Sequence, residues 1–465
     1  MRLHKIVLKN FRLFPALECT LHPELTVLVA DNGGGKTSIL DAISIAMGTY
    51  LGAFPTGKGA GIKPADVFSR VDDQELGRMQ TVYPASIYVW GTLWENGDTI
   101  NWVRELKSAK SHTTVKYAKL PSMYANHLQD LDANKPEDWP LLAYYGTGRL
   151  WNQKHLTGAR LFSSGFHDRA AGYIDCMEPA SSFKYFVDWF GHAYRSIFQS
   201  KLRFTEAHPN ATRQDIDAHT SAFSPLVDAV RRAVDTVLAP SGWGSINYSE
   251  TLQTLTAKHE QYGVLEVGQL SDGIRNVIAT VGDIAFRAVQ LNAHLGARAA
   301  LETSGIVLID EVDMHLHPSW QQVILKGLRE AFPRLQLIVT THSPQVLTSV
   351  DASCIRLLRQ EATPETGKQR TVSKQVKMQT RGVASSDVLA RIMGVDPIPD
   401  IPEAWMLSEY HALIQQNLHE GTEGQDLRAK LNAHFGTTHP VVLECDRMIR
   451  LQAIKQKLPL QKGSD

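Results

Sequence analysis

The sequence predicts an α/β fold, in which a mixed sheet carries a phosphate-binding-loop helix and is extended by a helical insertion and a C-terminal helical region. Three observations predict this fold. A glycine-rich turn, Ala30–Thr37, separates an apolar run from a helix-like run. Two later apolar runs, Ile306–Ile309 and one that starts at Leu335, are typical of buried parallel strands. A strongly periodic amphipathic helix begins near Ser271, before these two runs.

The turn at residues 30–37 has the composition of a phosphate-binding loop. Its glycines allow consecutive backbone N–H groups to surround phosphate oxygens without interference from Cβ atoms. Lys36 can reach the β- and γ-phosphates, and the Thr37 hydroxyl can hold Mg²⁺. The usual pattern begins with Gly, where this chain has Ala30. The predicted nucleotide-binding residues of this segment are Asn32, Gly33, Gly34, Gly35, Lys36, Thr37 and Ser38.

Strand-like alternation follows at residues 85–90, at residues 99–103 and near Val115, which predicts an antiparallel sheet beside the nucleotide site. Residues 101–119 are locally basic. They fit either a solvated hairpin or a ribbon that contacts phosphates.

Residues 152–255 interrupt the motifs, and we expect them to form a mostly helical insertion. The aromatic run that starts at Phe183 follows helical spacing and is apolar over more than one stripe. Core packing or a subunit contact explains this helix better than an aromatic box for a base.

The periodic helix opens with Gln269–Asn276, in which Ser271 is well placed as an N-cap and Gly273 permits close backbone approach. A capped helix is the simple interpretation. The alternative is a second anion site at the helix N-terminus. One phosphate loop does not need a second such site in the same chain, whereas an ATP shared between two chains does.

Asp310 and Glu311 follow the apolar run Ile306–Ile309, at the strand end where open α/β sheets bind ligands. Asp310 is suited to hold Mg²⁺, and Glu311 to orient and deprotonate the attacking water. The strand that starts at Leu335 ends in a polar turn with His342. A single histidine is usually a structural residue, but one at a strand's C-terminal end after the carboxylate strand is expected to touch the γ-phosphate. The predicted catalytic residues are therefore Glu311 and His342, and the predicted metal ligands are Thr37 and Asp310.

The order of these motifs resembles the ABC-type ATPases, and most closely the SMC/RecF/OLD-like branch of AAA-family ATPases. Asn10–Phe14 resembles the Asn-Phe-Arg motif of that branch, and Glu311–Pro318 its carboxylate strand with the trailing D-loop. The resemblance implies a dimer or higher oligomer that closes around ATP. In that dimer Ser271 and Gly273 contact the γ-phosphate bound by the partner subunit, and Arg12 lies near the base or ribose.

The resemblance also implies a domain order. Residues 1–151 form ABC ATPase lobe I, residues 152–255 the helical insertion and residues 256–360 lobe II. Residues 376–465 form a C-terminal extension for docking a partner. For the glutamine of the ABC Q-loop there is no clear match; Gln153 is close in sequence.

A narrower resemblance is to the PtuA ATPases of Septu and retron-linked antiphage systems. It lies in Leu142–Trp151 and in Gly172–Cys176, which precedes the aromatic helix. This resemblance implies that a separate HNH nuclease, similar to PtuB, is the partner.

Composition limits the class of protein. The 465 residues carry 48 basic and 48 acidic side chains, so the zero net charge argues against general nucleic-acid coating but permits local basic patches. The four cysteines are scattered, without metal-ligand or disulfide spacing. No apolar run approaches the ~20 residues that span a bilayer, and Met1 leads directly into a strand. We expect a cytoplasmic protein without membrane contact.

The C-terminal run Val441–Asp446 imitates the first acidic strand of a Toprim nuclease, but the residues after it are too few for the second strand. We therefore expect no intrinsic nuclease. Basic residues between Arg447 and Lys462 form either a solvated helix face or a surface that docks a partner, DNA or RNA. The sequence thus predicts a Mg²⁺-dependent ATPase that dimerises around ATP and senses or regulates for a separate nuclease in prokaryotic antiphage defence. The alternative is a RecF-like repair or recombination ATPase that binds DNA directly.

Overall fold

The computed structural model describes residues 1–72, 78–94, 97–132, 136–148, 168–179, 183–219, 221–362 and 369–457. The chain divides into two compact units, Met1–Met393 and Gly394–Asp465, which are described separately.

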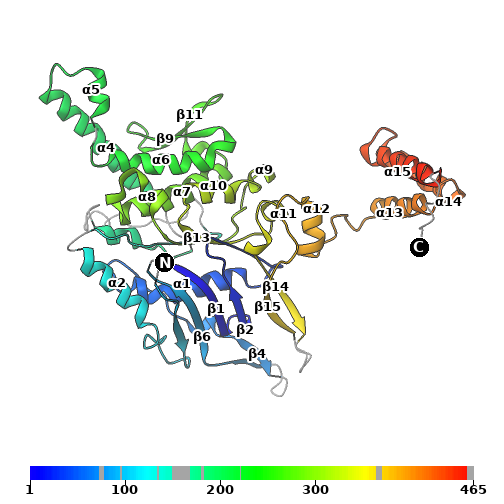
Figure 1. The fold of residues 1–465 in the computed structure, drawn as a ribbon, viewed down its shortest axis with the longest axis horizontal. Coiled ribbons are helices and arrows are strands. Elements are labelled where there is room, and N and C mark those ends of the chain that lie inside the picture. Colours follow the sequence, from blue (N-terminus) through cyan, green and yellow to red (C-terminus); the bar gives the residue numbers. More distant parts are fainter. Residues whose placement is uncertain are drawn as a thin grey trace, which may run out of the picture. The chain divides into compact units, whose positions relative to one another are not determined.

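A six-stranded sheet forms the centre of the larger unit (Figure 1). Its strands, in spatial order, are β15 (Gln369–Gln375), β14 (Ile355–Ala362), β3 (Leu25–Val29), β13 (Leu335–Thr340), β12 (Gly305–Ile309) and β8 (Leu141–Tyr145). All neighbours pair in parallel except β14 and β15. Every residue of the four strands β3, β13, β12 and β8 is buried, as expected for a sheet covered on both faces. The predicted α/β fold class is confirmed.

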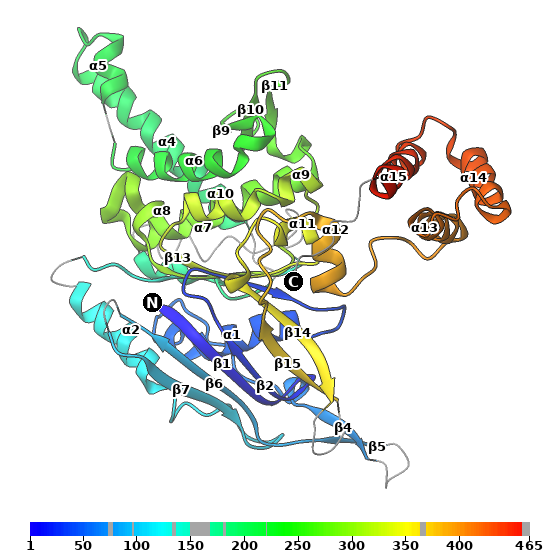
Figure 2. The ribbon, with the colours of Figure 1, turned by 45° about the vertical axis from the view of Figure 1, so that its right-hand side comes forward.

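A four-stranded antiparallel sheet lies beside the central one (Figure 2). It is formed by β2 (Phe14–Thr20), β1 (Arg2–Phe11), β6 (Ala85–Thr92) and β7 (Ile100–Leu106). Helix α1 (Lys36–Leu51) contacts strands of both sheets, which explains why it is buried over nearly its whole length. The strand predicted near Val115 is wrong: residues 113–118 are irregular and are joined to β7 by single hydrogen bonds, such as Thr114 N to Glu105 O at 2.8 Å.

Other elements complete this side of the unit. They are the hairpin β4 (Ser69–Asp72) and β5 (Arg78–Thr81), and helix α2 (Lys119–Asp132).

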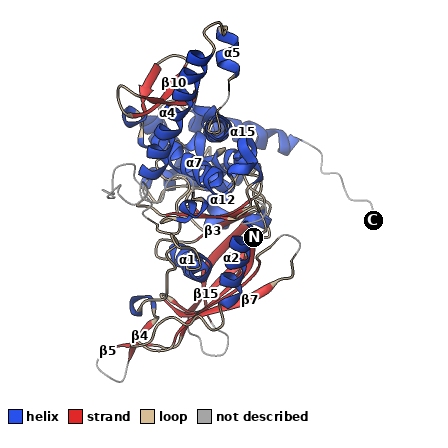
Figure 3. Ribbon diagram, turned by 90° about the vertical axis from the view of Figure 1, so that its left-hand side faces the viewer, coloured by secondary structure: helices blue, strands red, loops and turns tan. Residues whose placement is uncertain are grey.

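Helices cover the opposite side of the central sheet from α1 (Figure 3). They are α4 (Lys184–Ala207), α6 (Ser224–Leu238), α7 (Asp272–Leu291), α8 (Ala299–Glu302), α9 (Pro318–Gln321), α10 (Ile324–Ala331), α11 (Pro344–Leu347) and α12 (Ser385–Val388). Helix α5 (Arg213–Ala218) contacts α4 and projects away from the sheet (Figure 1). The aromatic residues of α4 are core residues: Phe186, Trp189 and Phe190 are buried, and the Trp189 ring lies 5.4 Å from that of Phe286.

The end of the predicted helical insertion differs from the structure. Residues 243–266 form a small sheet of β9 (Trp243–Ser249), β10 (Thr254–His259) and β11 (Gly263–Glu266), which crosses the predicted boundary at 255. These strands are stabilised by pairing with each other, which a local hydrophobic pattern does not reveal. Residues 149–167 of the predicted insertion and lobe boundary, including Gln153, lie outside the described residues.

The smaller unit consists of α13 (Pro402–Gln415), α14 (Thr422–Phe435) and α15 (Pro440–Lys457) around a core of its own. It begins at Gly394, later than the predicted boundary at 376, because Val376, Met378 and Val383 pack against the core of the larger unit. The strand-like run Val441–Asp446 is part of α15. Among the described helices, none combines the length and hydropathy needed to span a bilayer.

Candidate nucleotide-binding site

The glycine-rich turn joins the end of β3 to the start of α1, as predicted. Gly35 is the N-cap of α1 with a φ of 89°, and a Cβ there would lie 2.2 Å from Cζ of Phe14. A Cβ on Gly34 would lie 2.6 Å from the Cβ of Ala30. Glycine is therefore required at both positions, and Ala30, which departs from the usual pattern, packs beneath Gly34. Because Gly35 has no side chain to cap the helix, the first-turn N–H groups are available to an anion.

Lys36 lies across this turn. Its Nζ donates to the carbonyl oxygens of Ala30 at 2.9 Å and Asp31 at 3.2 Å. Burial lowers the pKa of Lys36, and the nearby carboxylates of Asp310 and Glu311 partly oppose that effect. The ammonium group thus lies where the loop curls, within the field of the two carboxylates that follow β12.

Thr37 and Asp310 are 273 residues apart in the chain but share a hydrogen bond of 2.7 Å from Oγ1 to Oδ2. Hydroxyl and carboxylate oxygens are ligands that Mg²⁺ prefers. Adjacent ligands of an octahedral ion with bonds of about 2.1 Å lie about 3 Å apart, which is close to this separation. The residues therefore fit a magnesium ion.

Glu311 follows Asp310 with a φ of 48°, an uncommon left-handed conformation for a residue other than glycine. Its backbone N–H donates to Oγ1 of Thr340 at 2.7 Å. The same hydroxyl donates to Oδ1 of Asp310 at 2.6 Å. One threonine at the end of β13 therefore orients both carboxylate residues.

Thr340 was not predicted from the sequence. The sequence feature that could have indicated it is the pair of hydroxyl residues, Thr340–Thr341, at the end of an apolar strand. Thr341 acts similarly, since its Oγ1 donates to Asp313 at 2.5 Å. His342 follows in the turn before α11, at the same edge of the sheet as Asp310, and is partly exposed.

Ser271 is the N-cap of α7, as predicted, but its hydroxyl does not cap the helix. Gly273 is buried, and a Cβ there would lie 2.4 Å from the carbonyl oxygen of His315. Gly273 thus has a role within its own chain: it lets α7 approach the segment after Glu311. Among the described residues, no hydrogen bond joins Ser271 or Gly273 to the phosphate loop of the same chain.

Arg12 lies between two carboxylates. It forms ion pairs with Asp41 of α1 and with Asp66, the latter at 3.0 Å. Burial opposes its charge, but Asp41 and Asp66 together raise the pKa of Arg12. Asp41 lies one helical turn after Thr37, so these contacts attach the Asn-Phe-Arg segment to the helix of the phosphate loop.

A buried polar chain connects β8 to α7. The carbonyl of Tyr145 accepts from the N–H of Asp310 at 2.8 Å. The side-chain hydroxyl of Tyr145 donates to Oδ2 of Asp283 at 2.7 Å. The same carboxylate oxygen accepts from Nε of Arg287 at 2.7 Å. Burial opposes the charge of Arg287, but Asp283 raises its pKa. Arg287 also donates to the carbonyls of Gly172 and Ile174, within the segment that resembles PtuA.

We expect Asp283→Ala to lower the free energy of unfolding by about 3–5 kcal/mol, because it leaves the buried guanidinium of Arg287 without its counter-charge. Urea denaturation followed by circular dichroism measures this change. The matched control is Glu302→Ala, which removes an exposed helix ion pair with Arg298 and should cost under about 1 kcal/mol. Equal costs for the two variants would show that the buried pair is not important for stability.

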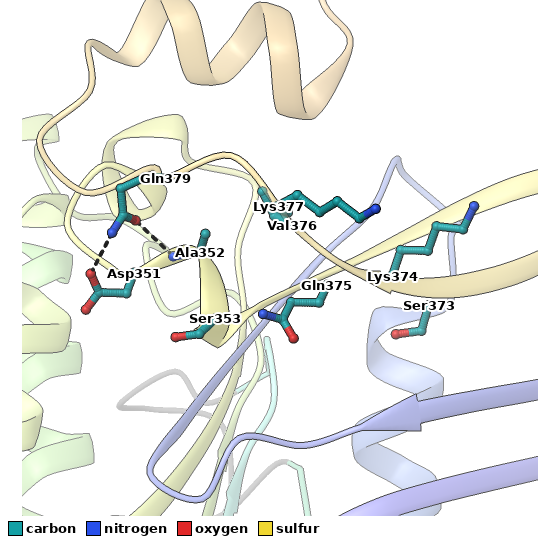
Figure 4. A pocket seen from close by; sticks show the side chains of 9 residues that line it. All are labelled: Asp351, Ala352, Ser353, Ser373, Lys374, Gln375, Val376, Lys377 and Gln379. Carbon is teal, nitrogen blue, oxygen red and sulfur yellow. Dashed lines mark hydrogen bonds between the residues drawn. The ribbon is translucent and has the colours of Figure 1, made fainter.

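A cavity of about 1110 Å³ opens elsewhere, between the turn at Asp351–Ser353 and the segment from Ser373 to Gln379 (Figure 4). The side chain of Gln379 bonds Asp351 and the backbone of Ala352 there. None of the predicted site residues lines this cavity.

Comparison with known proteins gives one family. The family model described as "AAA domain, putative AbiEii toxin, Type IV TA system" matches residues 25–348, which is more than half of the chain. The "Retron Ec83 probable ATPase" of Escherichia coli is 26% identical over 96% of this chain and 86% of its own length. The "Septu protein PtuA" of Bacillus mycoides (strain KBAB4) is 32% identical over 38% of this chain and 24% of its own length.

Among solved structures, the SMC head domain from Thermotoga maritima aligns with 81% of this chain and all of its own, at 15% identity and a TM-score of 0.41. The family match and the two relatives confirm the resemblance inferred from the motifs.

Proposed function

The chain belongs to the "AAA domain, putative AbiEii toxin, Type IV TA system" family, and we propose that it is a Mg²⁺-dependent ATPase that dimerises around ATP. One observation carries the proposal: Thr37 of the phosphate loop contacts Asp310 of a strand more than 270 residues away, beside Lys36 and Glu311. A purely structural carboxylate pair would not need a lysine, a threonine and a glycine-rich turn at the same strand edge.

Each residue has a task in the proposed reaction. The loop N–H groups and Lys36 bind the β- and γ-phosphates, and Thr37 and Asp310 hold Mg²⁺. Mg²⁺, when bound, neutralises charge that develops on the phosphate oxygens. Glu311 accepts a proton from the attacking water while Thr340 holds its backbone, and His342 contacts the γ-phosphate. ATP and water then yield ADP and inorganic phosphate.

The turn Leu270–Gly273 completes the site of the other subunit in this proposal. Ser271 is exposed and its hydroxyl is not used as a helix cap, so it is available to a phosphate of the partner's ATP. Because the contact would depend on the γ-phosphate, ATP favours the closed dimer and hydrolysis releases it.

Mixing two inactive variants tests the shared site. Lys36→Ala removes the ammonium group that binds the phosphates, and Ser271→Arg blocks the closing turn, so each variant alone should be inactive. In mixed dimers one of the two sites combines an intact loop with an intact turn, and random pairing should restore up to about a quarter of wild-type turnover. A phosphate-release assay on the mixture measures the recovery.

The control mixture is Lys36→Ala with Glu311→Gln. Both changes lie on the same side of the proposed site, so no mixed dimer contains an intact one and no activity should return. Failure of the first mixture to recover, or recovery in the control, contradicts a site shared between subunits.

We propose further that the ATPase acts as the sensor or regulator of a separate nuclease in antiphage defence. The proposal is supported by the retron and Septu proteins that the chain resembles. The smaller unit is the proposed docking part: α15 exposes Leu443, Leu451 and Ile454 on one face, together with Arg447. An HNH nuclease similar to PtuB is the proposed partner. Purification of the tagged chain from its host, with identification of bound proteins, tests this; bound recombination proteins instead would favour the RecF-like alternative.

A further inference from the structure

The four-stranded sheet has one face that α1 does not cover. The inner face of β1 is formed by Leu3, Ile6 and Leu8, which are buried in the core. On the outer face, the strand register places Lys5 opposite Trp90 and Val7 opposite Tyr88. Residues directly opposite each other in antiparallel strands share a face, so Lys5, Tyr88 and Trp90 lie together on this side.

The outer face carries a stacked aromatic pair with a lysine over each ring. The rings of Tyr88 and Trp90 have centroids 6.5 Å apart and planes inclined by 23°. Nζ of Lys5 lies 4.4 Å from the Trp90 ring, and Nζ of Lys9 lies 5.2 Å from the Tyr88 ring. Both rings are partly exposed, and Lys9 is exposed. The lysines could move from the rings to a ligand at little cost, because exposed cation–π contacts are weak.

The same combination of an aromatic ring and a lysine also occurs next to the edge strand β7. The N–H of Val103 on β7 donates to the carbonyl of Tyr117 at 3.1 Å, which brings the irregular segment 113–118 alongside the sheet. Tyr117 is 57% exposed, and Nζ of Lys116 lies 5.5 Å from its ring. A third aromatic residue with an adjacent lysine therefore lies beside the edge strand β7.

Two carboxylates share this face with the lysines: the register places Glu18 opposite Val7, and Glu105 opposite Ser86, which itself lies opposite Lys9. Among the described residues, Lys9 has no ion pair, and the partner of Lys5 is Glu18, a pair of 3.3 Å whose acidic side chain is 60% exposed. Exposed pairs of this kind contribute little stability and yield readily to another anion. The chain as a whole has no net charge, so a cluster of lysines beside aromatic rings marks a local surface and not a general basic character.

We infer that this face binds single-stranded nucleic acid. Tyr88, Trp90 and Tyr117 would stack on unpaired bases. Lys5, Lys9 and Lys116 would contact the phosphates between them. Sheets that present aromatic rings and basic side chains on an open face use this chemistry. Paired bases in a duplex do not offer their faces to such rings, so the surface selects single strands. The surface is separate from the phosphate loop and does not depend on ATP hydrolysis.

Fluorescence anisotropy of the full chain with labelled single strands of about 20 nucleotides, as DNA and as RNA, tests the inference. We expect single-stranded DNA, single-stranded RNA or both to bind at least tenfold more tightly than the matching duplex. The double substitution Tyr88→Ala/Trp90→Ala should weaken this binding at least tenfold, since stacking is a main source of single-strand affinity. Tyr88→Phe/Trp90→Phe keeps the aromatic rings and should retain binding.

Two further variants separate stacking from damage to the fold. Lys9→Glu changes only an exposed side chain, and should both weaken binding and reduce its dependence on salt. Tyr262→Ala removes an aromatic side chain that is 66% exposed on the separate sheet of β9–β11 and should leave binding unchanged. Absence of wild-type binding at about 50 mM salt, equal affinity for the duplex, or wild-type affinity in the alanine and glutamate variants would overturn the inference.

Discussion

The variant Glu311→Gln should turn over ATP about 100- to 10,000-fold more slowly than wild type, which is the range expected when a general base is removed. Glutamine has nearly the same shape but cannot accept the proton of the attacking water. The hydrogen bond from the backbone of residue 311 to Thr340 does not involve the side chain and should persist. Steady-state phosphate release measures the turnover.

The affinity for ATP, unlike the turnover, should not fall in this variant. Glu311→Gln should bind ATP as well as wild type and accumulate as the closed dimer, because the state before hydrolysis no longer decays. Size-exclusion chromatography with ATP and Mg²⁺ reports the dimer. Glu330→Gln, on the exposed side of α10, is the matched control and should behave as wild type. Normal turnover by Glu311→Gln would mean that another group is the base.

The second large effect is expected at Lys36. Replacing it with Ala should weaken ATP binding more than 100-fold, because about 3 kcal/mol is lost with two charge-assisted hydrogen bonds to phosphate. The loop itself should remain folded, since Gly35, Phe14 and the start of α1 do not depend on the ammonium group. Titration with a fluorescent ATP analogue measures the affinity.

Lys326→Ala removes an exposed lysine with a single helical ion pair and serves as the control. Wild-type affinity in Lys36→Ala would contradict the proposed phosphate site. A loss of affinity in both variants would point instead to a general effect of charge.

The elements of the site that could be predicted from the sequence are those whose chemistry is local. The turn Ala30–Thr37 and the carboxylates Asp310 and Glu311 are recognisable because each needs only its own strand and the residues that follow it. The strands β3, β12 and β13 were predicted for the same reason, as short apolar runs with polar ends.

The parts that were missed depend on distant pairing. Thr340 acquires its role because β13 lies beside β12, and Tyr145 because β8 lies on the other side of β12. The partners of Arg12 come from α1 and from residue 66, and neither is marked in the sequence. The strands β9 and β10 were not predicted because their strand conformation depends on pairing with neighbouring strands and not on their own composition.

In the proposed dimer, the close approach of Gly273 to His315 would couple the two nucleotide sites. The turn Leu270–Gly273, which is proposed to contact the nucleotide of the partner subunit, packs against the segment that follows Glu311 in its own chain. Whatever tilts one must displace the other, because packed backbone cannot be compressed. If two subunits share their sites as proposed, nucleotide bound in one site would affect the other through Gly273, and we expect a sigmoidal response to rising ATP and not a hyperbolic one.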